Sequence, residues 1–548
     1  MNYYPIKNTI QRRTRQQIQM LGINLSDNYT DGQLEDCNNI CADRFPYITT
    51  QKNLVEQNLS GGYGVLSMFA WEEMFVVTDH YVNGQGYACF YGGEPCGYMP
   101  TNDLPKQYAV VNTQMVVYPD KVYFNLNDAN IEPHSLDTAT LIGTGTVTFE
   151  LATDDTPARM AFTDNTITSR VNANHKILII GAKELTLNAT YTIDSITNSD
   201  GKYYINITSD FLVDRNTSDN VSFYDAGADG EYEIAPDMDY ICASDNRIWG
   251  VNNEQRTIYA SALGDATDFH SYEGLDTDAY AVAVGSAGAF TGCVALQNTV
   301  LFLKQHTIHK LLGGYPSEYV MYEYKLDGAS ETNGRSIVNC DGTAVFVTEH
   351  GIGTYYGSSS GTLSKELGEG GIYNAVGEYD GEKYILSFED DNNVPHLYIF
   401  DMRYNIWTKV ENIYATDIQH LGNDNYILTD GTIYKFSGEL DDDWDMTLRP
   451  IIETLTGTYN SKTSIFNKKR YWKIYIRLEL PIGSTFEAEV KTDNGAWHNA
   501  GRIAGDKDGV RTLVFKTDRC DKFQMRFKGH GPMTILAIER EFTEGSTR

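Results

Sequence analysis

Residues 236–274 read PDMDYICASDNRIWGVNNEQRTIYASALGDATDFHSYEG, and this stretch decides the fold class of the chain. Residues 240–244, 248–251 and 257–261 are short apolar and aromatic runs, and the polar clusters SDNR and NNEQ separate them. Such runs, divided by turn-forming residues, indicate an antiparallel meander. One small meander cannot bury both of its faces, so it must pack against similar sheets.

Similar groups of strand-like runs recur on both sides of this stretch. They return at a spacing of roughly 40–50 residues, which is typical of four-stranded propeller blades. The rest of the composition agrees, because 38 Tyr, 48 Gly and only 14 Pro favour twisted antiparallel sheets. We therefore predict an all-β chain in which a β-propeller of six or seven blades occupies residues 61–134 and 236–438.

Three other segments depart from this rhythm. Residues 135–235 contain strand candidates joined by strong turns such as Asn-Ser-Asp-Gly at 198–201, and we interpret them as a small β-domain inserted between two blades. In residues 439–548, Phe486, Ala488 and Val490 alternate with Glu487 and Glu489, which predicts a β-sandwich with one wet face. Residues 1–60, rich in Asn, Asp and turn formers, are predicted to form an irregular N-terminal arm.

The net charge, the hydropathy and the cysteine spacing argue against several classes of protein. With 43 Lys and Arg against 74 Asp and Glu, the net charge is −31, which argues against a protein that grips duplex DNA across its surface. No stretch is apolar for the roughly eighteen residues that a membrane span needs, and no secretory signal is recognisable. The eight Cys form no CxxC motif and are interpreted as free, mostly buried thiols of a protein made in a reducing cytosol.

Two motifs resemble catalytic or metal-binding signatures. His306 and His309 form an HxxH, but on a strand residues three apart point to opposite faces, so a metal site is not predicted. Ser359 occupies the nucleophile position of a GxSxG pattern at 357–361. A nucleophile elbow needs a helix after the serine, and the following residues are too short a run for one, so we interpret this pattern as a flexible turn.

Two groups of acidic residues are candidates for glycosidase catalysis or for metal binding. Asp265, Asp268 and Glu273 are candidates for a propeller glycosidase, although turns collect Asp for local hydrogen bonding, and we interpret the three as surface-turn residues. The acidic run from Asp441 to Asp445 offers ligands for a hard cation, yet a solvated interdomain linker is the preferred interpretation. We predict no catalytic residue, no metal site and no cofactor.

Basic and aromatic residues give two further hypotheses. Arg12, Arg13 and Arg15 form a small basic cluster, read as a solvated arm with docking on an acidic partner or DNA as the alternative. Trp249 is expected to pack between blades, and the sandwich residues Trp472 and Trp497 are expected in the core. Exposed and coplanar tryptophans would instead favour stacking on a glycan.

Several phrases together resemble a family of tailed-bacteriophage virion proteins. They are QLEDCNN at 33–39, RFPY at 44–47, PDMDYIC at 236–242, NRIWG at 246–250, IYASALGD at 258–265, VLFLK at 300–304 followed by His309-Lys310, and GIGTY at 351–355. In these phrases the chain is similar to packaged-DNA stabilisation and tail-nozzle proteins of short-tailed phages. The resemblance covers most of residues 30–440.

The resemblance implies a β-propeller virion protein without an active site. It would be made in the bacterial cytoplasm and built into the neck or tail as a cyclic homo-oligomer, beside portal, adaptor and tail proteins, with duplex DNA passing weakly bound through the lumen. A carbohydrate- or receptor-binding tail protein is the alternative, and a propeller glycosidase, which needs two carboxylates about 5–10 Å apart in one pocket, is the second alternative.

Overall fold

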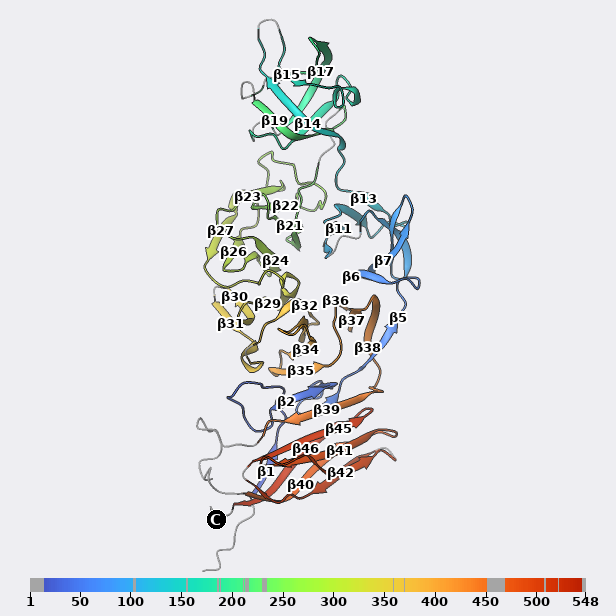
Figure 1. The fold of residues 1–548 in the computed structure, drawn as a ribbon, viewed down its shortest axis with the longest axis vertical. Coiled ribbons are helices and arrows are strands. Elements are labelled where there is room, and N and C mark those ends of the chain that lie inside the picture. The colour runs from blue at the N-terminus through green and yellow to red at the C-terminus, as the bar shows by residue number, and fades with distance from the viewer. Residues whose placement is uncertain are drawn as a thin grey trace, which may run out of the picture. The chain divides into compact units, whose positions relative to one another are not determined.

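The computed structural model consists of strands with a few short 3-10 helices (Figure 1). It describes residues 14–544 apart from 102–104, 154–155, 185–186, 188, 210, 212–215, 229–233, 358, 369, 451–468, 507–508 and 521. The chain divides into two compact units: Met1–Cys96, Ser286–Leu312 and Val320–Arg548 form the first, and Gly97–Gly285 with Gly313–Tyr319 form the second. The short helices are η1 (Thr168–Arg170), η3 (Pro316–Glu318), η4 (Gly334–Ser336) and η5 (Ser364–Glu366).

Within the described residues, seven sheets have four strands each, and we number these blades in chain order. Blade 1 contains β6 (Val65–Ala70), β7 (Met74–Val82), β8 (Gly86–Tyr91) and β9 (Glu94–Met99); blade 2 contains β10 (Gln107–Val111), β11 (Gln114–Tyr118), β12 (Val122–Asn125) and β13 (Pro133–Ser135). Blade 3 contains β20 (Tyr240–Ser244), β21 (Arg247–Asn252), β22 (Thr257–Ala260) and β23 (Tyr280–Ala283); blade 4 contains β24 (Phe290–Leu296), β25 (Thr299–Lys304), β26 (Thr307–Leu312) and β27 (Val320–Tyr324). Blade 5 contains β28 (Val338–Cys340), β29 (Thr343–Thr348), β30 (Gly351–Tyr356) and β31 (Ser359–Thr362); blade 6 contains β32 (Tyr373–Tyr379), β33 (Lys383–Glu389), β34 (Pro395–Asp401) and β35 (Ile406–Val410).

Blade 7 joins the two ends of the propeller sequence. Its first three strands are β36 (Asp417–Leu421), β37 (Asp424–Thr429) and β38 (Thr432–Ser437), and its outer strand is β5 (Asn53–Gln57) from the N-terminal region. β5 runs antiparallel to β38, with Leu54 opposite Phe436. A strand from before blade 1 therefore completes the last blade. The meanders and this closure confirm the predicted β-propeller.

The domain between blades 2 and 3 is a closed six-stranded barrel. Its strands are β14 (Thr140–Glu150), β15 (Arg159–Phe162), β16 (Lys176–Ile180), β17 (Thr190–Ser199), β18 (Lys202–Ile207) and β19 (Asn216–Asp225), in the order β14-β15-β18-β17-β16-β19. It has its own buried core, which includes Phe149, Ile177 and Phe223. At its base, Lys121 Nζ lies 3.5 Å from Asp137 on the outgoing connection and 2.6 Å from Asp237 on the returning one.

The C-terminal part forms a sandwich of two sheets with strands from the N-terminal region. The five-stranded sheet has the order β2 (Leu34–Asn38), β39 (Asp443–Leu448), β45 (Phe523–His530), β41 (Thr485–Thr492) and β42 (His498–Ala504). The seven-stranded sheet contains β3 (Ile40–Cys41), β4 (Ile48–Thr50), β46 (Thr534–Glu544), β40 (Lys469–Glu479) and β43 (Val510–Phe515), with β1 (Thr14–Ile18) beside β46 and β44 (Arg519–Cys520) beside β40. As predicted, Phe486, Ala488 and Val490 are buried.

The N-terminal prediction needs correction. The irregular arm predicted over residues 1–60 is replaced, from Thr14 on, by β1 to β5, which complete both sheets of the sandwich and blade 7. These runs are short, and β1, β2, β4 and β5 pair with β46, β39, β46 and β38, which lie far away in the sequence. They therefore need little hydrophobic periodicity of their own. Arg12 and Arg13 lie outside the described residues. Arg15 on β1 is exposed and lies 3.8 Å from Glu539 and Glu541.

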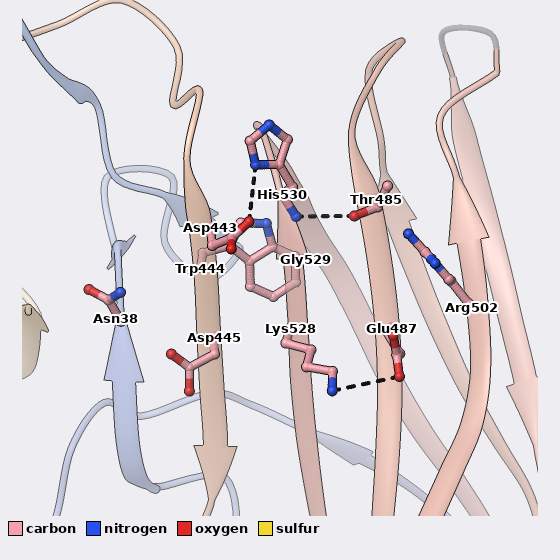
Figure 2. Close-up of a pocket in the computed structure, with 10 residues that line it drawn as sticks. All are labelled: Asn38, Asp443, Trp444, Asp445, Thr485, Glu487, Arg502, Lys528, Gly529 and His530. Carbon is pink, nitrogen blue, oxygen red and sulfur yellow. Dashed lines mark hydrogen bonds and ion pairs between the residues drawn. The ribbon is translucent and has the colours of Figure 1, made fainter.

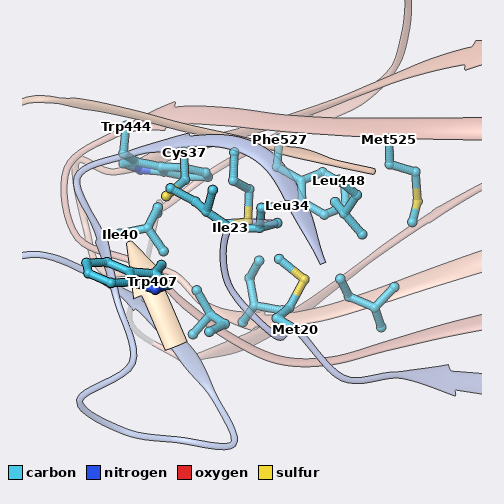
Figure 3. Close-up of a cluster of buried hydrophobic side chains, with 14 of the residues drawn as sticks. Met20, Ile23, Leu34, Cys37, Ile40, Trp407, Trp444, Leu448, Met525 and Phe527 are labelled. Atoms are coloured by element: carbon cyan, nitrogen blue, oxygen red, sulfur yellow. The ribbon is translucent and has the colours of Figure 1, made fainter. Parts of the chain in front are cut away.

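One hydrophobic core runs from blade 6 into the sandwich (Figure 3). Trp407 on β35 and Trp444 on β39 are both fully buried and belong to this cluster, together with Met20, Ile23 and Leu34 from the N-terminal region. The backbone N–H of Ile23 donates to the carbonyl of Trp407 at 2.8 Å. The N-terminal segment therefore fills the junction between two folds that belong to the same compact unit.

Candidate functional site

The polar face of the five-stranded sandwich sheet carries a hollow (Figure 2). Strand alternation places Glu487 and Glu489 of β41 on this face, because the apolar residues between them point into the core. The hollow has a volume of about 420 Å³ and is lined by Asn38, Asp443, Trp444, Asp445, Thr485, Glu487, Arg502, Lys528, Gly529 and His530. Gly529 forms part of its floor, where a Cβ atom would lie 2.6 Å from the ring of Trp444.

Charges alternate across the hollow from strand to strand. In the register of the sheet, Asp445 is opposite Lys528, Lys528 is opposite Glu487, and Glu487 is opposite Arg502. Cross-strand neighbours of opposite charge stabilise a sheet by a few tenths of a kcal/mol up to about 1 kcal/mol each. The primary effect of this row is therefore to neutralise a densely charged face.

Most of these charges have specific partners. Lys528 Nζ lies 2.8 Å from Glu489 Oε1 and 3.7 Å from Glu487 Oε1. The hydrogen bond to Glu489 raises the pKa of Lys528. His530 Nδ1 lies 3.0 Å from Asp443 Oδ1, and its Nε2 lies 3.6 Å from Asp441. Arg502 is exposed and forms no ion pair with a described residue, so its guanidinium is the group that the hollow offers to a ligand.

Asp445 lines the hollow and has a carboxyl group with a raised pKa. Burial, followed by the charges of Asp36 and Glu411, raises its pKa to about 6. Lys409 on β35 counters these charges, with Nζ 2.6 Å from Asp36 Oδ1 and 2.8 Å from Glu411 Oε1. Burial alone would lower the pKa of Lys409, but the two carboxylates outweigh burial and raise it. This group of charges links blade 6 to β2 and β39 of the sandwich.

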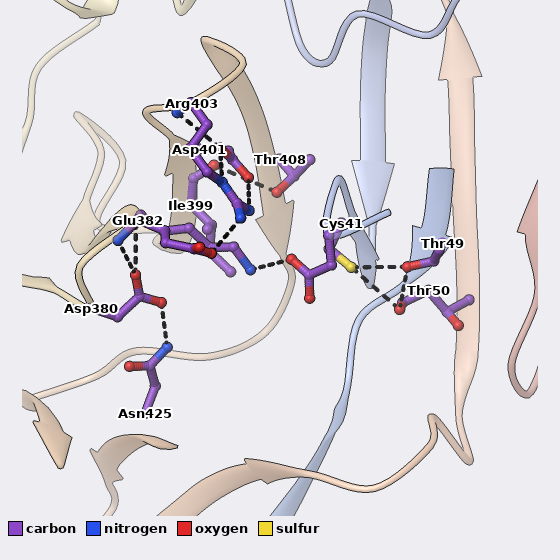
Figure 4. Close-up of polar contacts among 12 residues, drawn as sticks. Cys41, Thr49, Thr50, Asp380, Glu382, Ile399, Asp401, Arg403, Thr408 and Asn425 are labelled. Carbon is purple, nitrogen blue, oxygen red and sulfur yellow. Dashed lines mark hydrogen bonds and ion pairs between the residues drawn. The ribbon is translucent and has the colours of Figure 1, made fainter. Parts of the chain in front are cut away.

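A second hollow, also of about 420 Å³, lies beside the turns of blades 6 and 7 and the segment after β3. Figure 4 shows its polar contacts: Arg403 Nη2 lies 2.7 Å from Asp401 and Nη1 2.5 Å from Glu382, and Asp380 accepts a hydrogen bond from Asn425 at 2.8 Å. Lys383 pairs with Asp43 of the N-terminal segment. These contacts tie a turn of blade 6 to its neighbours.

The two histidines of the HxxH pair are separated, although His306 lies in the turn before β26 and not on the strand that was predicted for both. His309 on β26 is buried, and its Nε2 lies 2.8 Å from Ser286 Oγ. Burial lowers the pKa of His309. His306 is exposed in the turn before β26 and lies 3.3 Å from Asp327. The described residues contain no group of three or more His, Cys, Asp or Glu side chains arranged to hold a metal ion.

Ser359 begins the exposed edge strand β31, and its Oγ donates to the carbonyl of Tyr356 at 3.2 Å. The helix that follows is η5, which has three residues, so the strand–turn–helix context of a nucleophile elbow is absent at this position. The interpretation of this pattern as a flexible turn is wrong for residues 359–362, because they form the edge strand β31.

The three glycosidase candidates lie in a loop of blade 3. Asp265 Oδ1 accepts hydrogen bonds from the backbone N–H and the hydroxyl of Thr267, at 2.8 and 2.7 Å. Asp268 accepts from the backbone of His270 and from both the backbone and the hydroxyl of Ser271. Glu273 is exposed. The two aspartates stabilise their own loop, as turn residues do.

The acidic run 441–445 is not a linker along its whole length. Asp443 to Asp445 begin β39, where Trp444 is buried and its acidic neighbours point to the polar face. The interdomain-linker interpretation is therefore wrong for these residues, because a single buried tryptophan anchors the acidic run in a sheet. Asp441 and Asp443 are both exposed, on either side of His530.

The tryptophan predictions had different outcomes. Trp249 is buried and its ring centroid lies 5.3 Å from that of Tyr319, in agreement with a packing role. Trp472 and Trp497 are half-buried, so the prediction of core positions is wrong. Each is covered by an arginine: the guanidinium carbon of Arg470 lies 4.2 Å from the Trp472 ring centroid, and that of Arg526 lies 4.6 Å from the Trp497 ring centroid. The structure describes all eight cysteines; none of them forms a disulfide, and six are buried.

No family model and no curated protein matches this sequence. Among solved structures, PorZ of Porphyromonas gingivalis is similar at 9% identity and a TM-score of 0.26, over 90% of this chain and 82% of that one. The phage phi92 endosialidase is similar at 9% identity and a TM-score of 0.24, over 84% and 75%. An exo-β-1,3-galactanase from Phanerochaete chrysosporium has 8% identity and a TM-score of 0.21, over 54% and 92%. These values are too low to carry a function over to this chain.

The part of the chain that the structure describes has no helix long and apolar enough to cross a membrane.

Proposed function

We propose that this chain is a non-enzymatic structural protein of the neck or tail of a tailed bacteriophage, where it forms part of a ring that retains and conducts packaged DNA. The observation that supports a scaffold role is the unbroken core from blade 6 to the sandwich, with Trp407 and Trp444 in one buried cluster. A shared close-packed core resists bending, because close-packed interiors have few voids and low compressibility. The sequence phrases that resemble phage virion proteins supply the biological setting.

The charge of the chain fits a conduit that DNA slides past. A net charge of −31 repels phosphates at long range, and many of the basic side chains on the described surface are paired with carboxylates. We therefore expect the purified protein to bind duplex DNA only weakly at physiological salt. A sub-micromolar affinity that persists as salt is raised would contradict a passive conduit, because phosphate contacts weaken steeply with salt.

The neighbours in this role are portal, adaptor and other tail proteins, and the site of action is the virion. The test is mass spectrometry of gradient-purified particles of the phage that encodes the chain. A structural component is present at a stoichiometry of several copies per particle. Absence from particles that are otherwise complete would overturn the proposal.

A second candidate function is binding of a glycan or host receptor at the sandwich hollow. Arg502 offers an unpaired guanidinium there, and Trp497 lies over the same polar face, because Arg526 contacts both its ring and Glu489. Binding of a labelled glycan that is lost in Arg502→Ala and in Trp497→Ala would favour this function. Three carboxylates, Asp443, Asp445 and Glu487, also line the hollow, so the same ligands should be assayed for hydrolysis.

A further inference from the structure

The hairpin formed by β7 and β8 in blade 1 exposes aromatic side chains on both of its faces. Tyr81 and Tyr87 are cross-strand partners with ring centroids 5.1 Å apart, and Tyr81 is 54% exposed. His80 points the opposite way and stacks on Tyr63 with ring centroids 4.0 Å apart and planes 6° apart. We call Tyr81 and Tyr87, which share one face of the hairpin, the hairpin patch. Aromatic side chains are enriched at protein–protein interfaces, so an exposed pair of them indicates an interaction surface.

The hairpin patch also carries an acidic group. Asp79, next to His80, is exposed and forms no ion pair with a described residue. Its backbone N–H donates to the carbonyl of Gly64 at 2.8 Å, which holds the backbone of Asp79 in place. The hairpin therefore presents tyrosine rings with an unpaired negative charge beside them.

A second aromatic patch lies on blades 4 and 5. Val320 and Tyr322 on β27 are 48% and 46% exposed, and Tyr356 at the end of β30 is 66% exposed. Lys310 is opposite Tyr322 in the sheet, and its Nζ donates to the carbonyl of Gly357 at 3.0 Å, which joins the two blades. Lys310 forms no ion pair with a described residue. We call Lys310, Val320, Tyr322 and Tyr356 the two-blade patch.

The two patches belong to the same compact unit and stand at opposite ends of an arc of blades. In that unit, β24 contacts β28, β28 contacts β32, β32 contacts β36, and β36 contacts β6. Blades 4, 5, 6, 7 and 1 are thus neighbours in that order. Because propeller blades follow one another around a common axis, the first and last blades of a five-blade arc face away from the axis in different, roughly opposed directions.

We propose that the hairpin patch of one copy of this chain docks on the two-blade patch of the next copy, and that this contact builds the ring of the proposed function, on which the inference rests. Two different patches on opposed sides give a head-to-tail contact, and head-to-tail contacts form a ring when the rotation between successive copies closes on itself. Copies with a net charge of −31 repel each other, so they associate best where a negative group of one copy meets a positive group of the next. In this contact Asp79 of one copy meets Lys310 of the next. Tyrosines at the centre of the contact supply the buried area.

The first experiment uses two double variants of the full chain, Tyr81→Ser with Tyr87→Ser and Tyr322→Ser with Tyr356→Ser, with Val394→Ser as a control at an equally exposed position on blade 6. Light scattering after size exclusion measures the assembly state. Wild type and the control should assemble, and each double variant should assemble at least about tenfold more weakly. A mixture of the two double variants keeps one intact contact, so it should form dimers of one copy of each and no larger species.

A charge exchange tests the same contact without removing aromatic packing. Lys310→Glu and Asp79→Lys should each weaken assembly, and the two changes combined should restore it. A combined variant that assembles no better than either single variant contradicts the contact.

The outcomes separate this inference from the proposed function. If wild type forms rings and both double variants form them equally well, the patches are not the interface and the inference is wrong, while the ring role stands. If wild type stays monomeric at about 100 µM, the inference is wrong. The presence of the chain in purified particles then decides the proposed function independently.

Discussion

Lys409, on the last strand of blade 6, places its Nζ 2.6 Å from Oδ1 of Asp36, on a strand of the sandwich. This ion pair crosses the junction between the propeller and the sandwich at a point where the Lys409 side chain is only 12% exposed. The same ammonium lies 2.8 Å from Glu411, and the charges of Asp36 and Glu411 also act on Asp445. The ammonium group of Lys409 thus pairs with two carboxylates and also acts on the carboxyl group of Asp445.

Replacing that cation should destabilise the junction. Lys409→Met leaves Asp36 and Glu411 without their counter-charge, and we expect the free energy of unfolding to fall by about 1–3 kcal/mol, less than for a fully buried pair because Asp36 is partly exposed. Lys435→Met is the matched control, since Lys435 pairs with Asp424 on the surface of blade 7. Urea unfolding at pH 7.5 measures both. Equal losses in the two variants would contradict a special role for Lys409.

Asp445 should give the junction a characteristic pH dependence. Its pKa in the folded protein is about 6, above the ordinary value of 3.8, so the folded state holds this proton more tightly than the unfolded state. The stabilising effect of protonation is therefore complete at pH values below about 4 and is lost as the pH rises through about 6.

The check is a comparison with Asp445→Asn, which cannot ionise. Relative to this variant, the wild type should lose about 1–2 kcal/mol of stability between pH 4 and pH 7, a value reduced for the partial exposure of the carboxyl group. Unfolding is followed in urea at several pH values. If the difference in unfolding free energy between the two proteins did not change with pH, the pKa of Asp445 would not be raised in the folded state.

Trp407 should be essential to the joint core. Trp407→Ala removes a fully buried indole between blade 6 and the N-terminal segment, and cavities of this kind cost about 3–5 kcal/mol. Trp71→Ala, at a side chain that is 45% exposed, should change stability by less than about 0.5 kcal/mol. Thermal unfolding followed by circular dichroism measures both. If Trp407→Ala cost no more than Trp71→Ala, the junction would not be a packed core.

Closure of blade 7 by β5 should be detectable as local protection. Leu54 is partly buried in the core of blades 6 and 7 and is opposite Phe436. Leu54→Pro removes the packing of a partly buried leucine and a backbone N–H on the edge strand of the blade, and we expect it to cost about 1–3 kcal/mol. Hydrogen exchange of residues 432–437 should become much faster, with Val55→Thr as the control at the neighbouring exposed position. Unchanged exchange would mean that β5 contributes little to the blade.

The sequence allowed the repeated meanders and the sandwich alternation to be predicted, because both are local patterns. The regular spacing of apolar runs indicated blades, and the alternation of Phe486 with Glu487 indicated one buried and one polar face. The roles of β2 and β5 could not be predicted, because their partners β39 and β38 lie about 400 residues away in the sequence. Each of the two strands has only two apolar residues, too few to show a hydrophobic period.

The candidate site depended on information that is not local. The row from Asp445 through Lys528 and Glu487 to Arg502 exists only because four separated strands adopt one register. Trp472 and Trp497 were predicted in the core from their size, but an arginine covers each ring and both remain half-exposed. The charged residues that alternate with apolar ones in β41 and β45 could have indicated a polar sheet face with cross-strand ion pairs.

The most direct test of the proposed function is electron microscopy of intact particles in which this protein carries a label. The account predicts label at the neck or tail, repeated around the axis along which DNA leaves the particle. Label confined to another part of the particle, or particles without label, would contradict it.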